Sequence, residues 1–344
     1  MSEPELEPSI ATTEIRPYSH GDASGILAAF RRVFPDSVRS DAAWRWQFLD
    51  NPAGLRIVVA DSPGHGIVGQ FAGIPRRVSI ARPGGREIRT FTEMVDSFTT
   101  PEARRGLRRP GLFARIVNRY VARFGHPDGD TLMYGLPNGE ALPIGQRLLG
   151  YTSIFPFDAL TAPVDGATSI PKGDAVLEER FEWPPDVDAL WERARANKAC
   201  ALRRDHRYLD WRYVQILSRK DYEVWTARRN GTLCGLMVLQ PRHELIPSAC
   251  TIADWVVETA DEAVLDAFVH VATQRATELG REKVFAFFAP TAPEWQLFTA
   301  RGFAVLPSSI WMERRLVYLI TGSPMDEPYL ANQWWYTLGD SDLV

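Results

Sequence analysis

The stretch VDSFTTPEARRGLRRPGLFARIVNRY, from Val95 to Tyr120, joins an alternating apolar segment to a periodic one through a turn rich in cations. Four arginines lie in this turn: Arg104, Arg105, Arg108 and Arg109. Guanidinium groups bind phosphate through paired hydrogen bonds, and the free amides at the start of a helix attract anions. The stretch therefore predicts a phosphate site. A solvated basic turn is the alternative, since runs of charge usually lie on the surface.

A helix is expected directly after this turn. Pro110 suits the first helical position, and apolar residues follow at fourfold spacing: Leu112, Ile116, Tyr120 and Phe124. The amides from Gly106 to Phe113 would face an anion above the turn. The turn lacks the Gly-Lys-Ser/Thr sequence, which excludes a nucleotide-hydrolysing P-loop.

The segment GHGIVG, from Gly64 to Gly69, has the spacing of a dinucleotide-binding turn. Such a turn must lead into a helix whose N-terminus holds the pyrophosphate. Here the β-rich run IVGQFAGIP follows, in which Pro75 would break a helix. We therefore predict a β-hairpin, and no dinucleotide site, at this position.

Composition limits the partners of the chain, which has 344 residues, a net charge of −4, 45% hydrophobic and 24% charged residues. The negative charge argues against nucleic-acid binding, and no apolar run reaches the roughly 18 residues that a membrane helix needs. Residues 1–13 are acidic without the apolar core of a signal peptide, so we expect a disordered lead and a cytoplasmic protein. The three cysteines and six histidines are scattered, so no metal is expected.

The second half of the chain repeats the order of the first. WRW at Trp44 aligns with WRY at Trp211, an offset of 167 residues. Further matches keep the same order along both halves: Ala60 with Ala227, Gly69 with Gly235, MVDS at Met94 with IADW at Ile252, YGLPN at Tyr134 with FFAPT at Phe287, and RLLGY at Arg147 with TARGF at Thr299. Each half is predicted as helix, helix, β-hairpin, strand, helix, strand, short helix and strand.

Periodicity and turn residues predict where these elements lie in the first half: helices at 21–33, 41–49 and 110–124, and strands at 57–60, 68–74, 90–98, 132–136 and 151–155. We predict an α/β protein with two tandem domains, each a mixed twisted β-sheet flanked by helices. The predicted divisions are a lead (1–13), a first domain (14–160), a linker rich in Gly, Pro and Ser (161–175), a second domain (176–320) and an aromatic tail (321–344).

A strand, TTPEARRGLRRPGLF, a helix, YGLPN and QRLLGY follow one another here, and together they resemble the GCN5-related N-acetyltransferase superfamily. The doubled layout resembles its tandem members, although only the first half has the arginine turn. In the superfamily, a pyrophosphate loop of the form Gln/Arg-x-x-Gly-x-Gly/Ala follows the fourth strand. Two registers are open here: Arg108-x-x-Gly111-x-Phe113, with Phe113 at the small position, and Arg104-Arg105-Gly106-Leu107.

The resemblance implies an acyl-CoA cosubstrate, whose pantetheine would lie between the fourth and fifth strands. It places these residues at the cofactor: Ser97, Phe98, Thr99, Arg104, Arg105, Gly106, Arg108, Arg109, Gly111, Leu112, Phe113 and Asn138. Asn138 stands at the end of the fifth strand, where an asparagine of a simple turn is the alternative.

Acyl transfer to an amine needs a base that removes the ammonium proton. Glu93 lies 11 residues before Arg104, close to the spacing of the general-base glutamate in histone-type members, and burial would raise its pKa. A salt-bridged or edge-exposed Glu93 is the alternative. Asp96 is expected on the opposite face of the strand and competes for the role.

The tyrosine that commonly serves as the acid in the superfamily is absent, because its position holds Gln146 here and Phe298 in the second half. Tyr134 and Tyr151 are nearby substitutes. The second half has the acidic DWVVETADEAVLDAF in place of the arginine turn, so we expect it to shape the acceptor cleft. The C-terminal NQWWYTLGDSDLV is too aromatic for a disordered end and is expected to dock across the domain boundary.

These features favour an N-acyltransferase that moves an acetyl or longer acyl group from acyl-CoA to a primary amine of a small molecule. We expect a monomer or homodimer with no metal, nucleic-acid or membrane partner. Two other classes stay open. One is a non-catalytic acyl-CoA-binding or scaffold protein. The other is a FemABX-like aminoacyl ligase, which also pairs two such domains but would need a basic groove and a coiled-coil arm.

Overall fold

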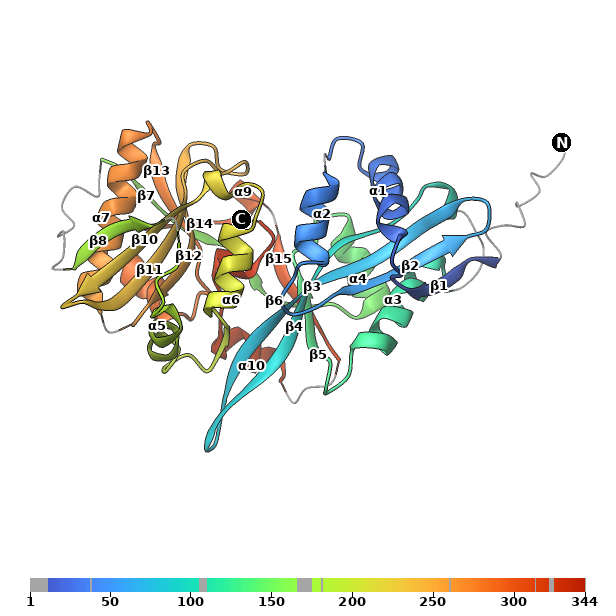
Figure 1. The fold of residues 1–344 in the computed structure, drawn as a ribbon, viewed down its shortest axis with the longest axis horizontal. Helices are drawn as coiled ribbons and strands as arrows, with labels where there is room; N and C mark the ends of the chain where they lie inside the picture. The colour runs from blue at the N-terminus through green and yellow to red at the C-terminus, as the bar shows by residue number, and fades with distance from the viewer. Residues whose placement is uncertain are drawn as a thin grey trace.

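The computed structural model describes residues 12–37, 39–104, 110–165, 175–180, 182–259, 261–312, 314–321 and 325–343. Two β-sheets lie side by side along the long axis of the molecule, each flanked by helices (Figure 1). The architecture is α/β with two tandem domains, as predicted.

The first sheet belongs mainly to the first half of the chain. Its strands, in order across the sheet, are β1 (Glu14–Pro17), β2 (Arg56–Ser62), β3 (Gly66–Arg82), β4 (Gly85–Thr99), β5 (Asp130–Gly135), β15 (Arg315–Ile320) and β6 (Thr152–Pro156). Its helices are α1 (Asp22–Val33), α2 (Asp41–Phe48), α3 (Leu112–Phe124) and α4 (Ala141–Leu149). The predicted order of elements is confirmed, but β3 and β4 are longer than expected and form the long hairpin at the bottom of Figure 1.

Helix α3 is fixed to the sheet by the apolar stripe that the sequence predicts. Ile116, Val117 and Tyr120 are buried and pack on β2 and β3. Gly73 of β3 makes room for this packing, because a Cβ there would lie 2.6 Å from the hydroxyl of Tyr120. The start of α3 is therefore held next to the end of β4.

The second sheet has the same plan. Its strands, in order, are β14 (Ala304–Leu306), β7 (Ala159–Pro163), β13 (Lys283–Ala286), β12 (Ala249–Val257), β11 (Thr232–Gln240), β10 (Glu223–Arg229) and β8 (Val176–Arg180). The helices of this half and of the C-terminal region are α5 (Val187–Ala194), α6 (His206–Leu209), α7 (Glu262–Glu278), α8 (Pro293–Thr299), α9 (Ser308–Trp311) and α10 (Glu327–Gln333).

Several strands cross between the halves. β7 pairs with β13 and β14 in the second sheet, whereas β15 pairs with β5 and β6 in the first. The short strands β9 (Cys200–Leu202) and β16 (Trp334–Trp335) also join the first sheet, next to β3. The sheets thus differ from the predicted divisions: residues 161–163 of the predicted linker lie in β7, and residues 315–320 complete the first sheet. Local patterns identify strands but not such distant pairing.

Strand registers agree with the predicted repeat at one pair of positions. Ala60 lies opposite Gly69, and Ala227 lies opposite Gly235, each beside a β-bulge in its hairpin. These glycines are therefore counterparts in the two halves.

In the helices, however, the repeat has a different offset. Ser40 caps α2 by accepting the amide of Ala43, and Asp205 caps α6 by accepting the amide of Tyr208, so the offset from 40 to 205 is 165 residues. Trp46, and not Trp44, is the counterpart of Trp211.

The two indoles make a nearly symmetric contact between the halves. Trp46 and Trp211 stack with ring centroids 5.1 Å apart. The indole N–H of each donates to the backbone carbonyl of the other, at 2.8 and 2.9 Å.

Candidate active site

The strands β4 and β5 separate beside the start of α3. They pair in parallel as far as Glu93 and Tyr134, after which β5 ends at Gly135 while β4 continues to Thr99. A β-bulge opens in β4 at Asp96, whose φ of 47° is left-handed. We call this break in backbone pairing the first gap. Along residues 94–99, β4 pairs with β3 on one edge and with no described strand on the other.

Glu93 is buried, with 1% of its surface exposed, and both carboxylate oxygens are occupied. Oε2 pairs with Arg76 at 2.5 Å, and Oε1 accepts the amide of Asp342 at 2.9 Å. Burial raises the pKa of Glu93 to about 8, and the charge of Asp342 acts in the same direction, whereas Arg76 lowers it. The structure therefore shows the salt-bridged alternative, in which Glu93 does not face an incoming amine directly.

Asp96 lies at the bulge and forms an ion pair with Arg39. Its carbonyl accepts the side-chain amide of Gln70 at 2.9 Å. The bulge interrupts the alternation on which we predicted opposite faces for Glu93 and Asp96. The charge of Asp342 acts both on Glu93 and on Arg39, the partner of Asp96. Asp342 is exposed, and the sequence analysis did not identify it as a site residue.

The two candidate tyrosines differ in how their hydroxyls are engaged. Tyr134 is buried and donates to the carbonyl of Asp340 at 2.7 Å. Tyr151 is half-buried, and its hydroxyl lies 3.4 Å from the sulfur of Met94, where β4 leaves β5. Burial raises the pKa of both phenols. Because a thioether is a weak acceptor, the Tyr151 hydroxyl is the more available of the two.

The arginine turn is described only in part, and Arg105, Gly106, Arg108 and Arg109 lie outside the described residues. Arg104 donates from Nε to the carbonyl of Thr99 at 3.0 Å. Gly111 occupies the N-cap of α3, where it supplies no side-chain cap, and a Cβ on it would meet no described atom within 4 Å. Within the described part of the chain no side chain caps this start, so the amides of Leu112 and Phe113 in the first turn are available there to water or an anion.

The other predicted cofactor residues have structural partners of their own. The hydroxyl of Ser97 donates to the carbonyl of Val95 at 3.1 Å, and Phe98 packs against Phe30. The side chain of Asn138 accepts the amide of Ala141 at 2.9 Å, so the structure shows it as a turn residue. What Ser97, Phe98 and Thr99 offer a cofactor is the backbone along the open edge of β4.

Residues 336–343, which we call the tail segment, lie between the two halves, and this confirms the predicted docking across the domain boundary. Three buried arginines bind it: Arg76 donates to the Gly339 carbonyl at 3.2 Å, Arg204 to the Asp340 carboxylate at 2.5 Å and Arg212 to the Ser341 carbonyl at 3.1 Å. These three arginines were not predicted as site residues from the sequence. Their one local signal is a charged residue in an apolar run, as at Arg76 in IPRRVSI.

The two halves together resemble solved structures of acyltransferases. A protein from Enterococcus faecalis, described as a probable N-acyltransferase, matches with a TM-score of 0.64 and 11% identity over 90% of this chain and 73% of its own. A GCN5-related N-acetyltransferase from Anabaena variabilis matches with a TM-score of 0.59 and 14% identity over 90% and 73%. The chain has the GCN5-related N-acetyltransferase fold. The N-myristoyltransferase of Saccharomyces cerevisiae, solved with myristoyl-CoA, matches with a TM-score of 0.56 and 9% identity over 93% and 81%. No family model and no curated protein matches the sequence.

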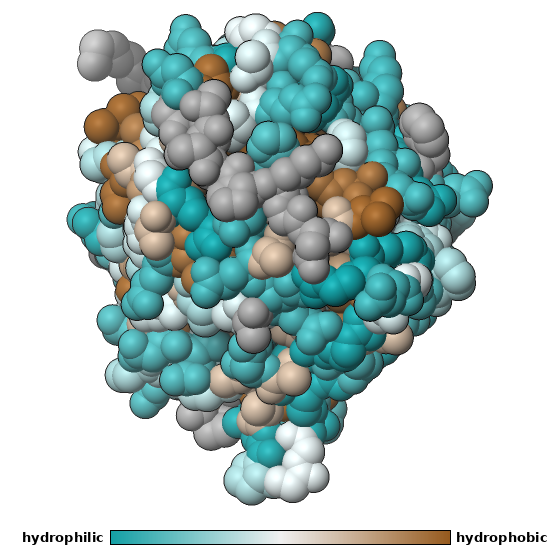
Figure 2. Space-filling model, turned by 90° about the vertical axis from the view of Figure 1, so that its left-hand side faces the viewer, coloured by the Kyte–Doolittle hydropathy of each residue, from teal (hydrophilic) through white to brown (hydrophobic). Residues whose placement is uncertain are grey.

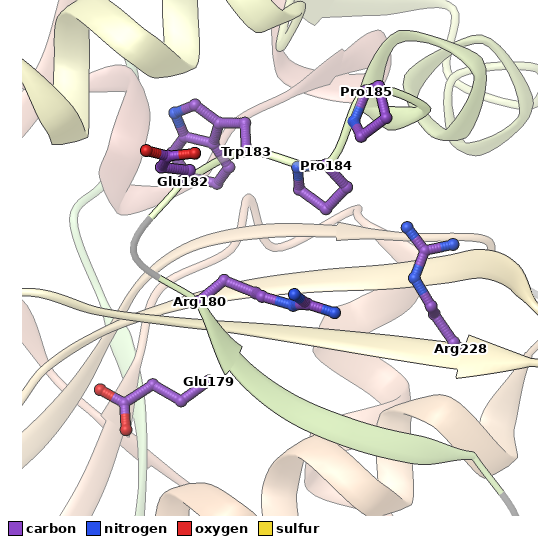
Figure 3. Close-up of a pocket in the computed structure, with 7 residues that line it drawn as sticks. All are labelled: Glu179, Arg180, Glu182, Trp183, Pro184, Pro185 and Arg228. Atoms are coloured by element: carbon purple, nitrogen blue, oxygen red, sulfur yellow. The ribbon is translucent and has the colours of Figure 1, made fainter.

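A surface pocket of about 520 Å³ lies in the second half of this GCN5-related fold. Figure 3 shows Arg180 and Arg228 extending into the space beneath Pro184, with Glu179 turned away. Arg228 is paired with Asp186 at 2.8 Å. The pocket lies at β8, an edge strand of the second sheet, so it is not part of the first gap. On the face shown in Figure 2, hydrophobic residues lie in separate patches among hydrophilic ones.

Within the described ranges, no group of three or more His, Cys, Asp or Glu side chains is arranged to hold a metal ion. No described helix has the length and apolar character needed to cross a membrane. Cys200, Cys234 and Cys250 are each buried as free thiols.

Proposed function

We propose that the protein transfers an acyl group from acyl-CoA to a primary amine of a small molecule, with the catalytic site in its first half. The observation that supports this most is the open edge of β4 beyond Glu93, next to the uncapped start of α3. An open strand edge binds an extended chain through backbone hydrogen bonds, and helix N-termini bind phosphate. Acyl-CoA, an extended amide chain that ends in phosphates, fits both features.

The reaction needs a proton transfer before the attack and another after it. The neutral amine attacks the thioester carbonyl, the nitrogen of the tetrahedral intermediate then gives up its second proton, and the C–S bond breaks as the leaving thiolate takes up a proton. Before the attack, the ammonium must lose its proton to a base. We assign this role to Asp342, which is exposed, because Glu93 and Asp96 are each held by an arginine.

Glu93 then becomes a positioning residue. Its carboxylate accepts the Asp342 amide, and Arg76 holds that carboxylate in place.

We assign protonation of the thiolate to Tyr151, whose hydroxyl lies beside Met94 where the strands separate. Both assignments depend on the first gap holding the thioester.

The acceptor in this proposal carries a positive charge before it reacts. Asp342 places negative charge beside the first gap, and such charge attracts an ammonium. The acyl group is acetyl or longer, because a protein with this fold was solved with myristoyl-CoA.

A non-catalytic acyl-CoA-binding protein is the second candidate. The ion pairs of Glu93 and Asp96 and the engaged hydroxyl of Tyr134 favour it, because they leave fewer side chains free for proton transfer.

Calorimetry and thiol release separate the two candidates. Acetyl-CoA is titrated into the protein, and free thiol is then followed with glucosamine, lysine, a lysine-containing tripeptide or an aminoglycoside as the acceptor. Binding with amine-dependent thiol release supports transfer. Binding without release for any of these amines supports the binding protein, and binding of neither acetyl-CoA nor myristoyl-CoA contradicts both.

A further inference from the structure

The second sheet repeats the separation of strands, and the tail segment occupies it. β12 and β13 pair in parallel and then separate after Ala286, which forms a second gap. Just beyond β13, Phe288 bridges to Thr337, and the amide of Ala289 donates to the carbonyl of Tyr336 at 2.8 Å. The chain's own backbone thus lies in the second gap and pairs on its β13 side, whereas in the first half we propose the pantetheine of acyl-CoA along β4.

Asp254 of β12 holds the tail segment from the other side of the second gap. Its carboxylate accepts Arg204 Nε at 2.8 Å and the Thr337 hydroxyl at 3.2 Å. The tail also approaches Asp254 closely, because a Cβ on Gly339 would lie 2.5 Å from the Asp254 carboxylate carbon. Asp254 stands next to the bulge of β12, as Asp96 stands at the bulge of β4, so the two aspartates are counterparts with different partners.

From the second gap, the tail segment passes directly to the side chains of the first half. Three hydrogen bonds make this connection: Arg76 to the Gly339 carbonyl at 3.2 Å, Tyr134 to the Asp340 carbonyl at 2.7 Å, and the Asp342 amide to Glu93 at 2.9 Å. One short stretch of backbone therefore links the second gap to the edge of the first.

Buried charges fix the tail segment in this position. Arg204, Asp254 and Asp340 are each no more than 1% exposed, and Arg204 bridges the two carboxylates. Because buried charges are costly without their partners, such a network disfavours every arrangement that separates them. The path of the tail segment is accordingly set by residues of the second half.

We infer that the tail segment replaces acyl-CoA in the second gap, so that the chain binds one acyl-CoA, and that Asp254, Arg204 and Thr337 are positioning residues that act through this segment on the first-half site. The inference rests on the proposed function, since it names what the second half contributes to that reaction.

Substitutions of Thr337 test this inference with the least disturbance. The Thr337 hydroxyl accepts Arg204 at 2.7 Å and lies 3.2 Å from the Asp254 carboxylate. Thr337→Val keeps the shape and removes the hydroxyl, whereas Thr337→Ser keeps the hydroxyl. Asp186→Asn is the control, because it removes a carboxylate from a surface ion pair of the second half.

We expect calorimetry to give one acetyl-CoA per wild-type chain. In Thr337→Val, amine-dependent thiol release should fall roughly tenfold or more, because small displacements of reacting groups are costly. Its acetyl-CoA affinity should stay within about twofold of wild type, and its pH profile of kcat/KM should shift. Hydrogen exchange at the Asp342 amide should become faster. Thr337→Ser and Asp186→Asn should behave as the wild type does.

If the wild type binds two acetyl-CoA molecules per chain, the tail segment does not replace acyl-CoA in the second gap. If Thr337→Val folds and keeps its turnover, its pH profile and its hydrogen-exchange rate at the Asp342 amide, then Thr337 does not act through the tail segment on the first-half site. If Thr337→Val does not fold, Gly339→Ala, which crowds Asp254, is measured in the same way. If the wild type binds acetyl-CoA but releases no thiol with any amine, the proposed function fails. The number of acetyl-CoA molecules bound per chain and the hydrogen-exchange rate at the Asp342 amide still test the inference.

Discussion

The two halves share their strand order and their bulges but differ at two places around the gap. In the first half, Gly111 leaves the start of α3 without a side-chain cap. In the second half, Asp261 caps α7 by accepting the amide of Val264 at 3.2 Å, and its carboxylate, which also pairs with Arg229, occupies this helix start. The first gap has an open strand edge, whereas the second is filled by the tail segment. A few local residues thus distinguish the half that we propose to bind acyl-CoA from the half that we propose to support it, without a change of fold.

The buried network of the second gap should give the largest effect. Arg204→Ala leaves Asp254 and Asp340 without their buried cation and should lower the free energy of unfolding by about 3–5 kcal/mol. Arg228→Ala, which breaks a surface pair with Asp186, should cost less than about 1 kcal/mol. Urea unfolding followed by tryptophan fluorescence measures both. If both variants lost the same free energy of unfolding, the buried network of the second gap would contribute no more to stability than a surface ion pair.

The proposed base gives the next effect, on activity. Asp342→Asn cannot accept the ammonium proton and should lower kcat for thiol release by about 100-fold, with acetyl-CoA affinity within about twofold of wild type. Glu327→Gln, which removes an exposed carboxylate from the same C-terminal region, is the control and should change neither value. If Asp342→Asn turns over as fast as the wild type, Asp342 is not the base.

Glu93 in the first half should make the stability of the protein depend on pH. The pKa of Glu93 is raised to about 8 in the folded protein, from about 4.3 in the unfolded chain, so between these values the folded state keeps a proton that the unfolded state has lost. The associated stability is present below the lower value and is lost as the pH rises through the higher one. Compared with Glu93→Gln, the wild type should lose free energy of unfolding as the pH is raised from about 5 to about 9.

Urea midpoints for the two proteins at several pH values in this range check that expectation. A difference between them that stays constant with pH would mean that Arg76 keeps the Glu93 carboxylate ionised throughout.

The contact between the halves should give the smallest effect. Trp46→Phe and Trp211→Phe each remove one indole hydrogen bond and should each cost about 1 kcal/mol. Because the two bonds are nearly equivalent, the losses should match, and a double-mutant cycle by urea unfolding measures their coupling. Unequal losses would show that the two halves do not contribute equally to this contact.

Local features of the fold could be predicted well from the sequence. The hairpin at GHGIVG is confirmed, with Ser62 opposite Gly66 and left-handed φ angles at Gly64 and Gly66. The crossing of β7 into the second sheet and of β15 into the first could not be predicted, because the sequence patterns of these segments indicate strands but not the sheet that each one joins.

The site was predictable only in part, for a similar reason. Glu93 was predicted from its spacing to Arg104 and the family resemblance, but its partners Arg76 and Asp342 come from other segments of the chain and could not be predicted in this way. The helix after the arginine turn was predicted to begin at Pro110, whereas α3 begins at Leu112 with Gly111 as its N-cap. The phosphate role of Arg105 and Arg108 stays a prediction, since both lie outside the described residues.

The position of β15 also has a consequence for how the protein is made. β15 inserts between β5 and β6, so these two strands gain their shared neighbour only when the ribosome has translated residue 320. At rates of about 5–20 residues per second, the emerging polypeptide waits roughly 8 to 30 s between the synthesis of β6 and that of β15. During this delay two strand edges are exposed to other nascent chains, which makes chaperone protection most important for the domain that is translated first.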